Sequence, residues 1–144
     1  MTTIQVAPIV SATAEVLAAF HRLIPQLSSS SLPITMVELE EIVGSTTTIL
    51  FAARQDSEIV GLLTLAIFRI PTGVRAWIED VVVDDLARGM GAGEALSRAA
   101  LDAARQRGAK TVDLTSRPSR EVANRLYQRI GFVRRDTNVY RYEL

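Results

Sequence analysis

The sequence of 144 residues contains no cysteine and a single histidine, His21. The lack of cysteine excludes disulfides, thiolate metal sites and a cysteine nucleophile. A histidine-based metal centre or a Ser-His-Asp triad would depend on His21 alone. This residue lies in a stretch with the apolar spacing of an amphipathic helix, which favours a structural role. The sequence therefore predicts no metal site.

Long apolar runs are absent as well. No segment of about 18 residues is apolar enough to span a membrane. The start "MTTIQVAPIV" lacks the basic residues and the long apolar core of a signal peptide. We therefore expect a cytoplasmic protein that has no membrane partner.

Aromatic residues make up only 6% of the chain, and the formal net charge is zero. Nucleic-acid-binding domains usually combine strong positive charge with aromatic platforms, so we expect no nucleic-acid partner. The charges are unevenly divided, because residues 1–85 carry 4 basic and 10 acidic groups whereas residues 86–144 carry 12 and 6. The basic part suits a polyanionic small ligand, although a solvated arginine-rich helix surface would give the same imbalance.

Apolar periodicity predicts four helices and seven strands. The helices are expected after Ser11, Thr35, Arg88 and Ser119, and Thr35 forms a capping box with Glu38. The predicted strands cover residues 3–9, 46–54, 59–70, 74–84, 110–116, 132–135 and 138–144. This order predicts one α/β (α+β) domain over residues 1–144, with a mixed central sheet of about seven strands flanked by about four helices.

The predicted strand over residues 74–84 has apolar residues on both faces and two carboxylates within it. Apolar residues on both faces indicate a central strand that is covered on both sides. Glu79 and Asp80 would then face inward, and since an uncompensated buried carboxylate is costly, both are candidates for a functional role. Strict alternation places Trp77, Glu79, Val81 and Val83 on one face and Ile78, Asp80 and Val82 on the other.

The stretch "RGMGAG" at residues 88–93 has glycine at three alternate positions before an alanine-rich helix. Glycine weakens a helix start, so these residues indicate either a turn that the fold requires or a cradle of bare N–H groups for an anion. A P-loop is excluded because no Gly-Lys-Ser/Thr follows. A dinucleotide-binding fingerprint is disfavoured because Leu96 stands where its third glycine would be.

The same stretch matches the R/Q-x-x-G-x-G/A motif of the GNAT superfamily of N-acetyltransferases. A second stretch, "ANRLYQRIGF" at residues 123–132, resembles that superfamily's helix with an Asn and a Tyr followed by Gly-Phe. The specific motifs cover residues 77–133, and the element order fits the whole chain. The resemblance implies a GNAT-like domain that moves an acetyl group from acetyl-CoA directly to a primary amine of a small molecule or protein.

Acetyl transfer requires that the diphosphate is held, the carbonyl polarised, the amine deprotonated and the leaving thiolate protonated. The resemblance implies that main-chain N–H groups of residues 89–94, together with Arg88, hold the diphosphate. The backbone of residues 81–83 would hold the pantetheine arm and polarise the carbonyl. The cofactor-binding residues implied in this way are Val81, Val82, Val83, Arg88, Gly89, Met90, Gly91, Ala92, Gly93, Glu94, Asn124 and Tyr127.

The resemblance also implies the catalytic groups. Tyr127 falls on the superfamily's tyrosine and would protonate the thiolate, since a phenol with a pKa near 10 is a suitable weak acid. Glu79 would act through water as the base for the amine, and Asp80 would contact substrate or pair with a neighbour such as Arg75. The stretch "IEDVVV" is similar to that of glucosamine-6-phosphate N-acetyltransferases. The residues expected to rim the acceptor pocket are Thr115, Ser116 and Arg117.

Three points stay open from the sequence. The chain could be a non-catalytic CoA-binding regulatory module, although such a module would need neither Tyr127 nor Glu79. The acceptor amine is undefined, because the region "SSSSLPIT" carries no motif. The last predicted strand has Tyr140, Tyr142 and Leu144 on one face, and its edge could pair with a second copy in a homodimer.

Overall fold

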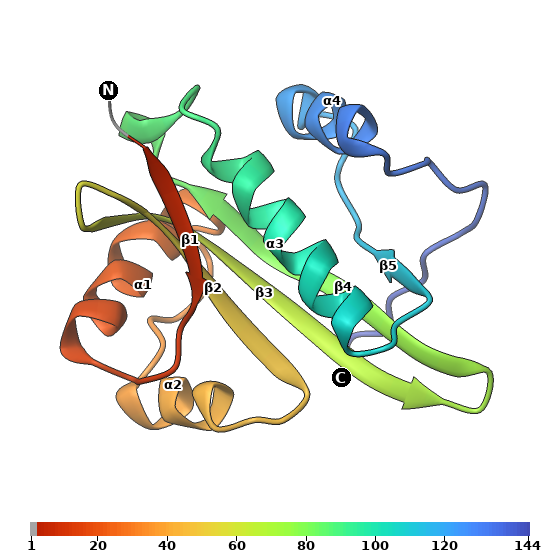
Figure 1. The fold of residues 1–144 in the computed structure, drawn as a ribbon, viewed down its shortest axis with the longest axis horizontal. Helices are drawn as coiled ribbons and strands as arrows, with labels where there is room; N and C mark the ends of the chain where they lie inside the picture. Colours follow the sequence, from red (N-terminus) through yellow and green to blue (C-terminus); the bar gives the residue numbers. More distant parts are fainter. Residues whose placement is uncertain (1–2) are drawn as a thin grey trace.

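The computed structural model describes residues 3–144 as one five-stranded sheet with helices on both faces (Figure 1). The strands are β1 (Ile4–Pro8), β2 (Thr48–Gln55), β3 (Glu58–Ile70), β4 (Gly73–Val83) and β5 (Thr111–Asp113). The helices are α1 (Ala14–Leu27), α2 (Met36–Val43), α3 (Ala92–Gln106) and α4 (Glu121–Ile130), with a 3₁₀ turn η1 (Asp85–Ala87). The predicted α/β architecture and its four helices are confirmed. Within residues 3–144, no helix combines the length and apolar character needed to cross a membrane.

The strands lie in the sheet in chain order, and the first four are antiparallel to their neighbours. β5 is parallel to β4 and pairs with it over three residues, from Arg75 opposite Thr111 to Trp77 opposite Asp113. β4 continues to Val83, so its residues 78–83 have no strand partner on the β5 side among residues 3–144. The sheet therefore opens between β4 and the segment that leaves β5.

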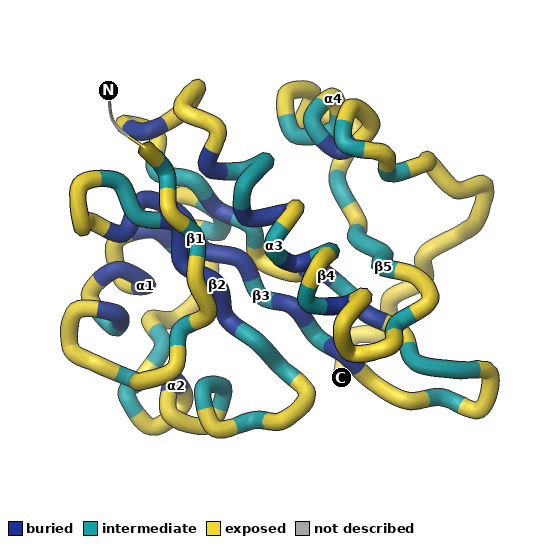
Figure 2. Tube along the Cα trace, viewed as in Figure 1, coloured by how far each residue is buried: buried dark blue, intermediate teal, exposed yellow. Residues whose placement is uncertain are grey.

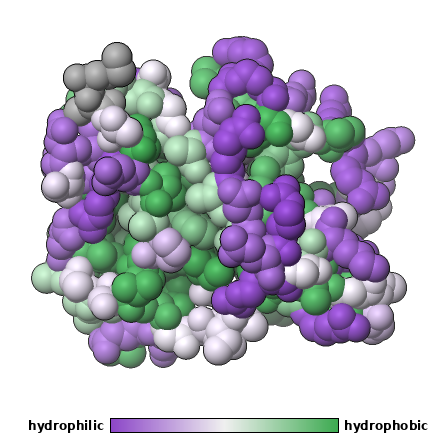
Figure 3. Space-filling view, viewed as in Figure 1, coloured by the Kyte–Doolittle hydropathy of each residue, from purple (hydrophilic) through white to green (hydrophobic). Residues whose placement is uncertain are grey.

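Two hydrophobic cores cover the two faces of the sheet, and their buried segments follow the strands in Figure 2. The core under α3 includes Leu63, Leu65, Ile78 and Leu96. The core under α1 and α2 includes Leu23, Leu39, Leu50, Leu62 and Val82. Figure 3 shows hydrophilic side chains along the outer side of α3, as expected for an amphipathic helix that buries its alanine-rich face.

Side chains cap the first two helices. The predicted capping box of α2 is confirmed, because Thr35 Oγ1 accepts from Glu38 N at 3.1 Å and Glu38 Oε1 accepts from Thr35 N at 2.9 Å. The cap of α1 is Thr13 rather than Ser11, since Thr13 Oγ1 accepts from Val16 N at 3.2 Å. In both helices a threonine hydroxyl oxygen therefore accepts a hydrogen bond from a backbone N–H group of the first turn that has no partner within the helix.

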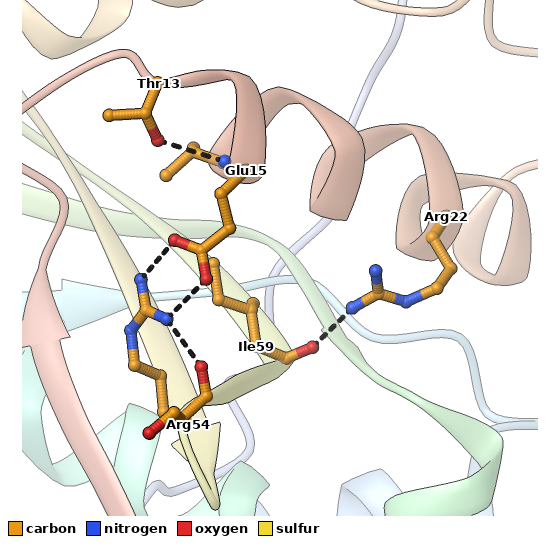
Figure 4. A network of polar contacts seen from close by, with 7 residues as sticks. Thr13, Glu15, Arg22, Arg54 and Ile59 are labelled. Carbon is orange, nitrogen blue, oxygen red and sulfur yellow. Dashed lines mark hydrogen bonds and ion pairs between the residues drawn. The ribbon is translucent and has the colours of Figure 1, made fainter.

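A polar network joins α1 to the hairpin between β2 and β3 (Figure 4). Arg54 donates two hydrogen bonds to the Glu15 carboxylate, at 2.8 and 3.1 Å, and Arg22 donates to the carbonyl oxygen of Ile59. The bond from Arg54 holds the pKa of the Glu15 carboxyl below its ordinary value. These contacts fix α1 against the end of the sheet where β4 also ends.

The two closing strands predicted at residues 132–135 and 138–144 are wrong for this structure. Residues 132–144 belong to no helix or strand, which gives five strands instead of seven. The strand predicted at residues 110–116 is likewise limited to Thr111–Asp113. Alternating apolar residues report how well a segment suits a sheet and do not show that an edge is available to pair with it.

Candidate active site

A cleft of about 440 Å³ lies where β4 ends, between the start of α3 and the start of α4. Most of the predicted cofactor-binding residues line it: Val81, Val83, Arg88, Gly89, Gly91, Ala92, Gly93, Glu94 and Tyr127. The structure therefore brings the glycine-rich stretch, the end of β4 and the helix with Tyr127 to one place.

A β-bulge in β4 shapes one wall of this cleft. Glu79 is opposite Thr64 and Val82 is opposite Leu62, so two residues of β4 are placed against Leu63 alone. Asp80, one of these two, has a left-handed backbone with φ of 51°. Asp adopts this conformation more readily than bulky residues do, because its short polar side chain can bond locally. The bulge changes which face each following side chain occupies.

The predicted division of the β4 side chains between two faces is wrong across the bulge, because Ile78 shares a face with Val81 and Val83 and not with Val82. Ile78, Val81 and Val83 all pack in or against the core under α3, whereas Val82 is buried in the opposite core. Strict alternation fails because the bulge inserts one residue into the pattern. As a result Val81 and Val83 face the cleft, and Val82 supports β4 from behind.

The two carboxylates of β4 are exposed, not inward-facing as the sequence predicted. Glu79 lies on β4 just before the bulge and Asp80 lies within it, on the part of β4 that β5 no longer accompanies. Neither carboxylate forms an ion pair within residues 3–144, so the suggested pair between Asp80 and Arg75 is not formed. Both remain open to a cationic group from outside the chain.

The three glycines of "RGMGAG" have different structural reasons. Gly89 and Gly91 have φ of 82° and 87°, and a Cβ atom on either would meet nothing within 4 Å. These two glycines make the tight turn into α3 and leave its N–H groups uncovered. Gly93 lies inside α3, where a Cβ atom would come within 3.2 Å of Leu126, so it permits close packing of α4.

Two helix N-termini meet at the cleft, and neither has a side-chain cap. Gly91 precedes α3 and Arg120 precedes α4, and within residues 3–144 no side chain bonds the first N–H groups of either helix. The helices away from the cleft, α1 and α2, are both capped. Uncapped N–H groups carry partial positive charge and bind anions well. This arrangement fits a diphosphate, which would be held by the N–H groups at the start of α3.

Charged side chains surround these N-termini. Glu94 accepts hydrogen bonds from Arg129 at 2.9 Å and from Arg98 at 3.0 Å, and these bonds lower the pKa of its carboxyl. This bridge joins α3 to α4 across the cleft. Arg88 pairs with Asp85 at 2.9 Å, which sets its guanidinium beside the glycine turn.

Tyr127 forms part of the inner wall of the cleft. Its ring is 7% exposed and packs edge-on against Phe132, with 5.7 Å between the ring centres. Burial raises the pKa of the phenol, and the nearby positive charge of Arg120 opposes part of that rise. Like any phenol with a pKa near or above 10, it carries its proton at neutral pH, and the residue lines the cleft.

Several predicted site residues lie outside the residues that line the cleft. Val82 is buried behind β4, and Met90 is half-exposed at the glycine turn. Asn124 donates from Nδ2 to the carbonyl oxygen of Arg117 at 2.9 Å and so holds the segment before α4. Thr115 and Arg117 are exposed after β5, and Ser116 Oγ is a buried atom without a hydrogen-bond partner within residues 3–144.

Sequence reasoning missed part of the α4 wall. The cleft residues not predicted are Ala87, Ser119, Glu121, Val122, Ala123, Leu126 and Arg129. Arg120, which the sequence offers beside Arg117 as a contact for an acidic substrate or the cofactor phosphates, lines the cleft as well. Helical spacing offered a signal for one of the missed residues, because Ala123 is four residues before Tyr127 and therefore shares its face.

The start of the glycine turn is tied to α1. Gln26 Oε1 accepts from Asp85 N at 2.9 Å, and Arg22 lies 3.9 Å from the Asp84 carboxylate. Asp84 in turn caps η1 by accepting from Leu86 N at 3.1 Å. The loop that presents Arg88 is therefore fixed at its first residues before the ligand arrives.

Comparison with known proteins supports the resemblance to GNAT acetyltransferases that the sequence motifs indicated. The family model of the acetyltransferase (GNAT) family matches residues 17–132. Among solved structures, an acetyltransferase from Trypanosoma brucei is similar at 26% identity and a TM-score of 0.77, covering 99% of this chain and 100% of that one. A comparison with curated proteins gives no match.

Two further solved structures share the fold. Glucosamine-6-phosphate N-acetyltransferase from Arabidopsis thaliana is 21% identical with a TM-score of 0.82, over 97% of this chain and 98% of that one. An aminoglycoside N-acetyltransferase in complex with CoA is 15% identical with a TM-score of 0.83, over 99% and 96%. Because the family match spans well over half of the sequence, the chain belongs to the acetyltransferase (GNAT) family and is an N-acetyltransferase.

Proposed function

We propose that this protein transfers an acetyl group from acetyl-CoA directly to a primary amine of a small molecule. The observation that carries the proposal is the meeting of two uncapped helix N-termini at a cleft that Tyr127 also lines. The GNAT family uses acetyl-CoA, and the related structure with CoA supports the same cosubstrate here. We propose that the whole chain acts as one domain. That the protein is cytoplasmic and that it uses no metal remain predictions.

The binding roles follow from the cleft. The N–H groups at the start of α3 and the guanidinium of Arg88 would hold the diphosphate. The open edge of β4 at residues 81–83 offers backbone groups to the pantetheine arm, and an N–H near Val81 or Val82 would polarise the thioester carbonyl. Acetyl-CoA itself supplies the activated acetyl group and the thiolate that leaves.

The proton-handling roles fall to two side chains. Tyr127 holds a proton on its phenol oxygen and would give it to the departing sulfur. Glu79, exposed on β4 just before the bulge, would take a proton from the incoming ammonium through water. Asp80 beside it would attract the same cation, while Thr115, Ser116 and Arg117 would rim the acceptor side. Exposed carboxylates without partners favour a cationic acceptor.

The acceptor class rests on the similar proteins. One of them acts on glucosamine 6-phosphate and others on aminoglycosides, as their names state. These are small molecules that carry primary amines, so we extend that class to this chain. A homodimer also belongs to the proposal. Two alternatives are separated by the following experiment: a protein amine as the acceptor, and a non-catalytic module that only binds CoA.

Thiol release from acetyl-CoA is the direct test. Because the chain has no cysteine, every thiol detected comes from the cosubstrate. We expect one class among aminoglycosides, amino sugar phosphates, polyamines and lysine peptides to raise the rate at least about tenfold over acetyl-CoA alone, a barrier difference of about 1.4 kcal/mol. Acceleration by lysine peptides alone would move the proposal to protein amines. Tight CoA binding with no acceleration by any amine would support the binding module.

Replacing Glu79 with glutamine is expected to lower kcat/KM for the amine about a hundredfold, the usual scale for losing a general base. The residual rate should rise with pH, since the ammonium must then lose its proton to bulk solvent. Glu58→Gln is the matched control, because Glu58 is also an exposed glutamate on a strand. Neither glutamate lines the cleft, but Glu79 lies two residues before the cleft residue Val81, whereas Glu58 lies at the start of β3. Equal rates for the two variants would remove Glu79 from the mechanism.

A further inference from the structure

The arginines that line the cleft differ in how their charges are matched. Arg88 pairs with Asp85 at 2.9 Å, and Arg129 pairs with Glu94 at 2.9 Å. Arg120 also lines the cleft, but its side chain forms no ion pair within residues 3–144. The cleft therefore contains one guanidinium whose charge no carboxylate of the described chain contacts.

The turn before α4 fixes the backbone of Arg120. The Arg120 N–H donates to the carbonyl oxygen of Arg117 at 3.0 Å, and the Arg120 carbonyl oxygen accepts from Asn124 N at 3.0 Å. Asn124 Nδ2 donates to the same Arg117 oxygen at 2.9 Å. These three hydrogen bonds hold the turn, so the side chain of Arg120 leaves the backbone from a defined position beside the cleft.

Arg120 and Tyr127 lie on the same side of α4. Their separation of seven residues is about two turns of a helix, and both residues line the cleft. Burial raises the pKa of the Tyr127 phenol, and the positive charge of Arg120 opposes part of that rise, so its field reaches the phenol oxygen. The neighbouring carboxylate of Glu121 lines the cleft too, but no ion pair joins it to Arg120.

The proposed reaction places negative charge beside Tyr127. The amine nitrogen bonds the carbonyl carbon, the carbon–sulfur bond breaks with its electron pair on the sulfur, and the Tyr127 proton moves to that sulfur. The phenol oxygen then carries the charge until it regains a proton from water. A thiol has a pKa near 8.5 and a phenol one near 10, and burial raises that of Tyr127 further. This proton transfer is therefore uphill unless a positive charge stabilises the phenolate.

We propose that the guanidinium of Arg120 stabilises the negative charge that leaves on the sulfur of CoA and passes to the oxygen of Tyr127. This inference rests on the proposed acetyl transfer and adds a charge-stabilising residue to it. A fixed cation near developing charge lowers the barrier most where water is excluded. The phosphates of CoA are the competing target for the same guanidinium, since arginine commonly binds phosphate. The experiment below distinguishes the two targets.

The test is a titration of the thiol of CoA bound to the full chain, followed by the ultraviolet absorbance of the thiolate. Because the chain has no cysteine, the thiolate signal belongs to CoA. A neighbouring arginine lowers the pKa of a thiol. We therefore expect Arg120→Gln to raise the pKa of the bound thiol by about one pH unit, a tenfold change in its ionisation constant. Arg120→Lys keeps the charge and should stay close to the wild type.

Arg125→Gln is the matched control, because Arg125 is an exposed arginine of α4 that does not line the cleft. An unchanged thiol pKa in Arg120→Gln, or an equal change in Arg125→Gln, would overturn the inference. Weaker CoA binding at an unchanged thiol pKa would overturn it too, by assigning Arg120 to the phosphates.

Steady-state kinetics give a second readout. Arg120→Gln should lower kcat about tenfold and leave KM for acetyl-CoA within about twofold, because the charge is absent from the bound thioester. A raised KM with an unchanged kcat would contradict the inference. A wild type that binds CoA but transfers acetyl to no amine would overturn the proposed function, whereas the thiol titration needs no amine and still decides the role of Arg120.

Discussion

Replacing Gly91 with alanine is expected to weaken acetyl-CoA binding by about tenfold to a hundredfold, equal to about 1.4–2.8 kcal/mol. Gly91 ends the turn before α3, and a Cβ atom there would point into space that the chain leaves empty at the cleft. A diphosphate that approaches the N–H groups of α3 would need that space. The added methyl would therefore act on the ligand, and isothermal titration with CoA measures the loss.

The same substitution also strains the backbone, and the chain offers a control for this effect. Gly108 has φ of 82°, close to the 87° of Gly91, and a Cβ atom there would also meet nothing within 4 Å. It lies after α3, outside the cleft. Both Gly→Ala variants should lose about 1–2 kcal/mol of stability, or roughly 3–8 °C in Tm. Only the Gly91 variant should lose affinity; equal CoA binding by the two would show that the turn is structural and not a cradle.

The sequence predicted the parts of the fold and of the site that depend on local chemistry. The glycine turn, the capping box at Thr35 and the helix carrying Tyr127 all form where their residues indicated. Each is encoded within a few consecutive residues, through positive φ, a side chain that bonds a nearby N–H group, or the 3.6-residue period. Such signals do not depend on what lies across the fold.

The features that sequence reasoning missed depend on distant partners. The bulge at Asp80 arises where β4 pairs with β3. No glycine in this part of β4 indicates a position with positive φ, because the residue that adopts it is Asp80. The inward-facing carboxylates were predicted from apolar residues on both faces of the strand, a pattern that does not show where β5 stops accompanying β4. Arg129 reaches the cleft because α4 packs against α3, and the ion pair from Arg129 to Glu94 spans 35 residues of sequence.

The two C-terminal strands were predicted from the residue pattern alone, and this is why the prediction was wrong. The pattern at residues 138–144 describes a segment suited to a sheet, and this property is genuine. Whether a strand forms depends on a free edge in the right place, and a single copy does not pair the segment with one.

Replacing Tyr127 with phenylalanine is expected to lower kcat about a hundredfold, with little change in KM for acetyl-CoA. The phenol is the proposed proton donor to the departing sulfur, and losing a general acid costs about 10²–10⁴-fold. The ring should keep its edge-on packing against Phe132, because the two side chains differ only in the hydroxyl. Stability should therefore stay near that of the wild type, which separates a chemical role from a packing role.

The pH dependence gives a second readout of the same variant. Burial raises the pKa of Tyr127, so the phenol stays protonated through the neutral and mildly alkaline range and the deficit of the Phe variant should be constant there. Below the ordinary tyrosine pKa, near 10, the folded and unfolded chains are both protonated at this residue, and stability does not depend on its titration. Above it the unfolded chain ionises first, so the stability that this residue contributes declines as pH rises further.

Tyr140→Phe is the matched control for the loss of a phenol hydroxyl. Tyr140 is 87% exposed, lies outside the cleft and should leave kcat within about twofold of the wild type. If Tyr127→Phe is as active as this control, Tyr127 serves packing only, and the proton must reach the sulfur from water. If only the Tyr127 variant is slow, and its Tm is unchanged, then a buried phenol with a raised pKa is the acid.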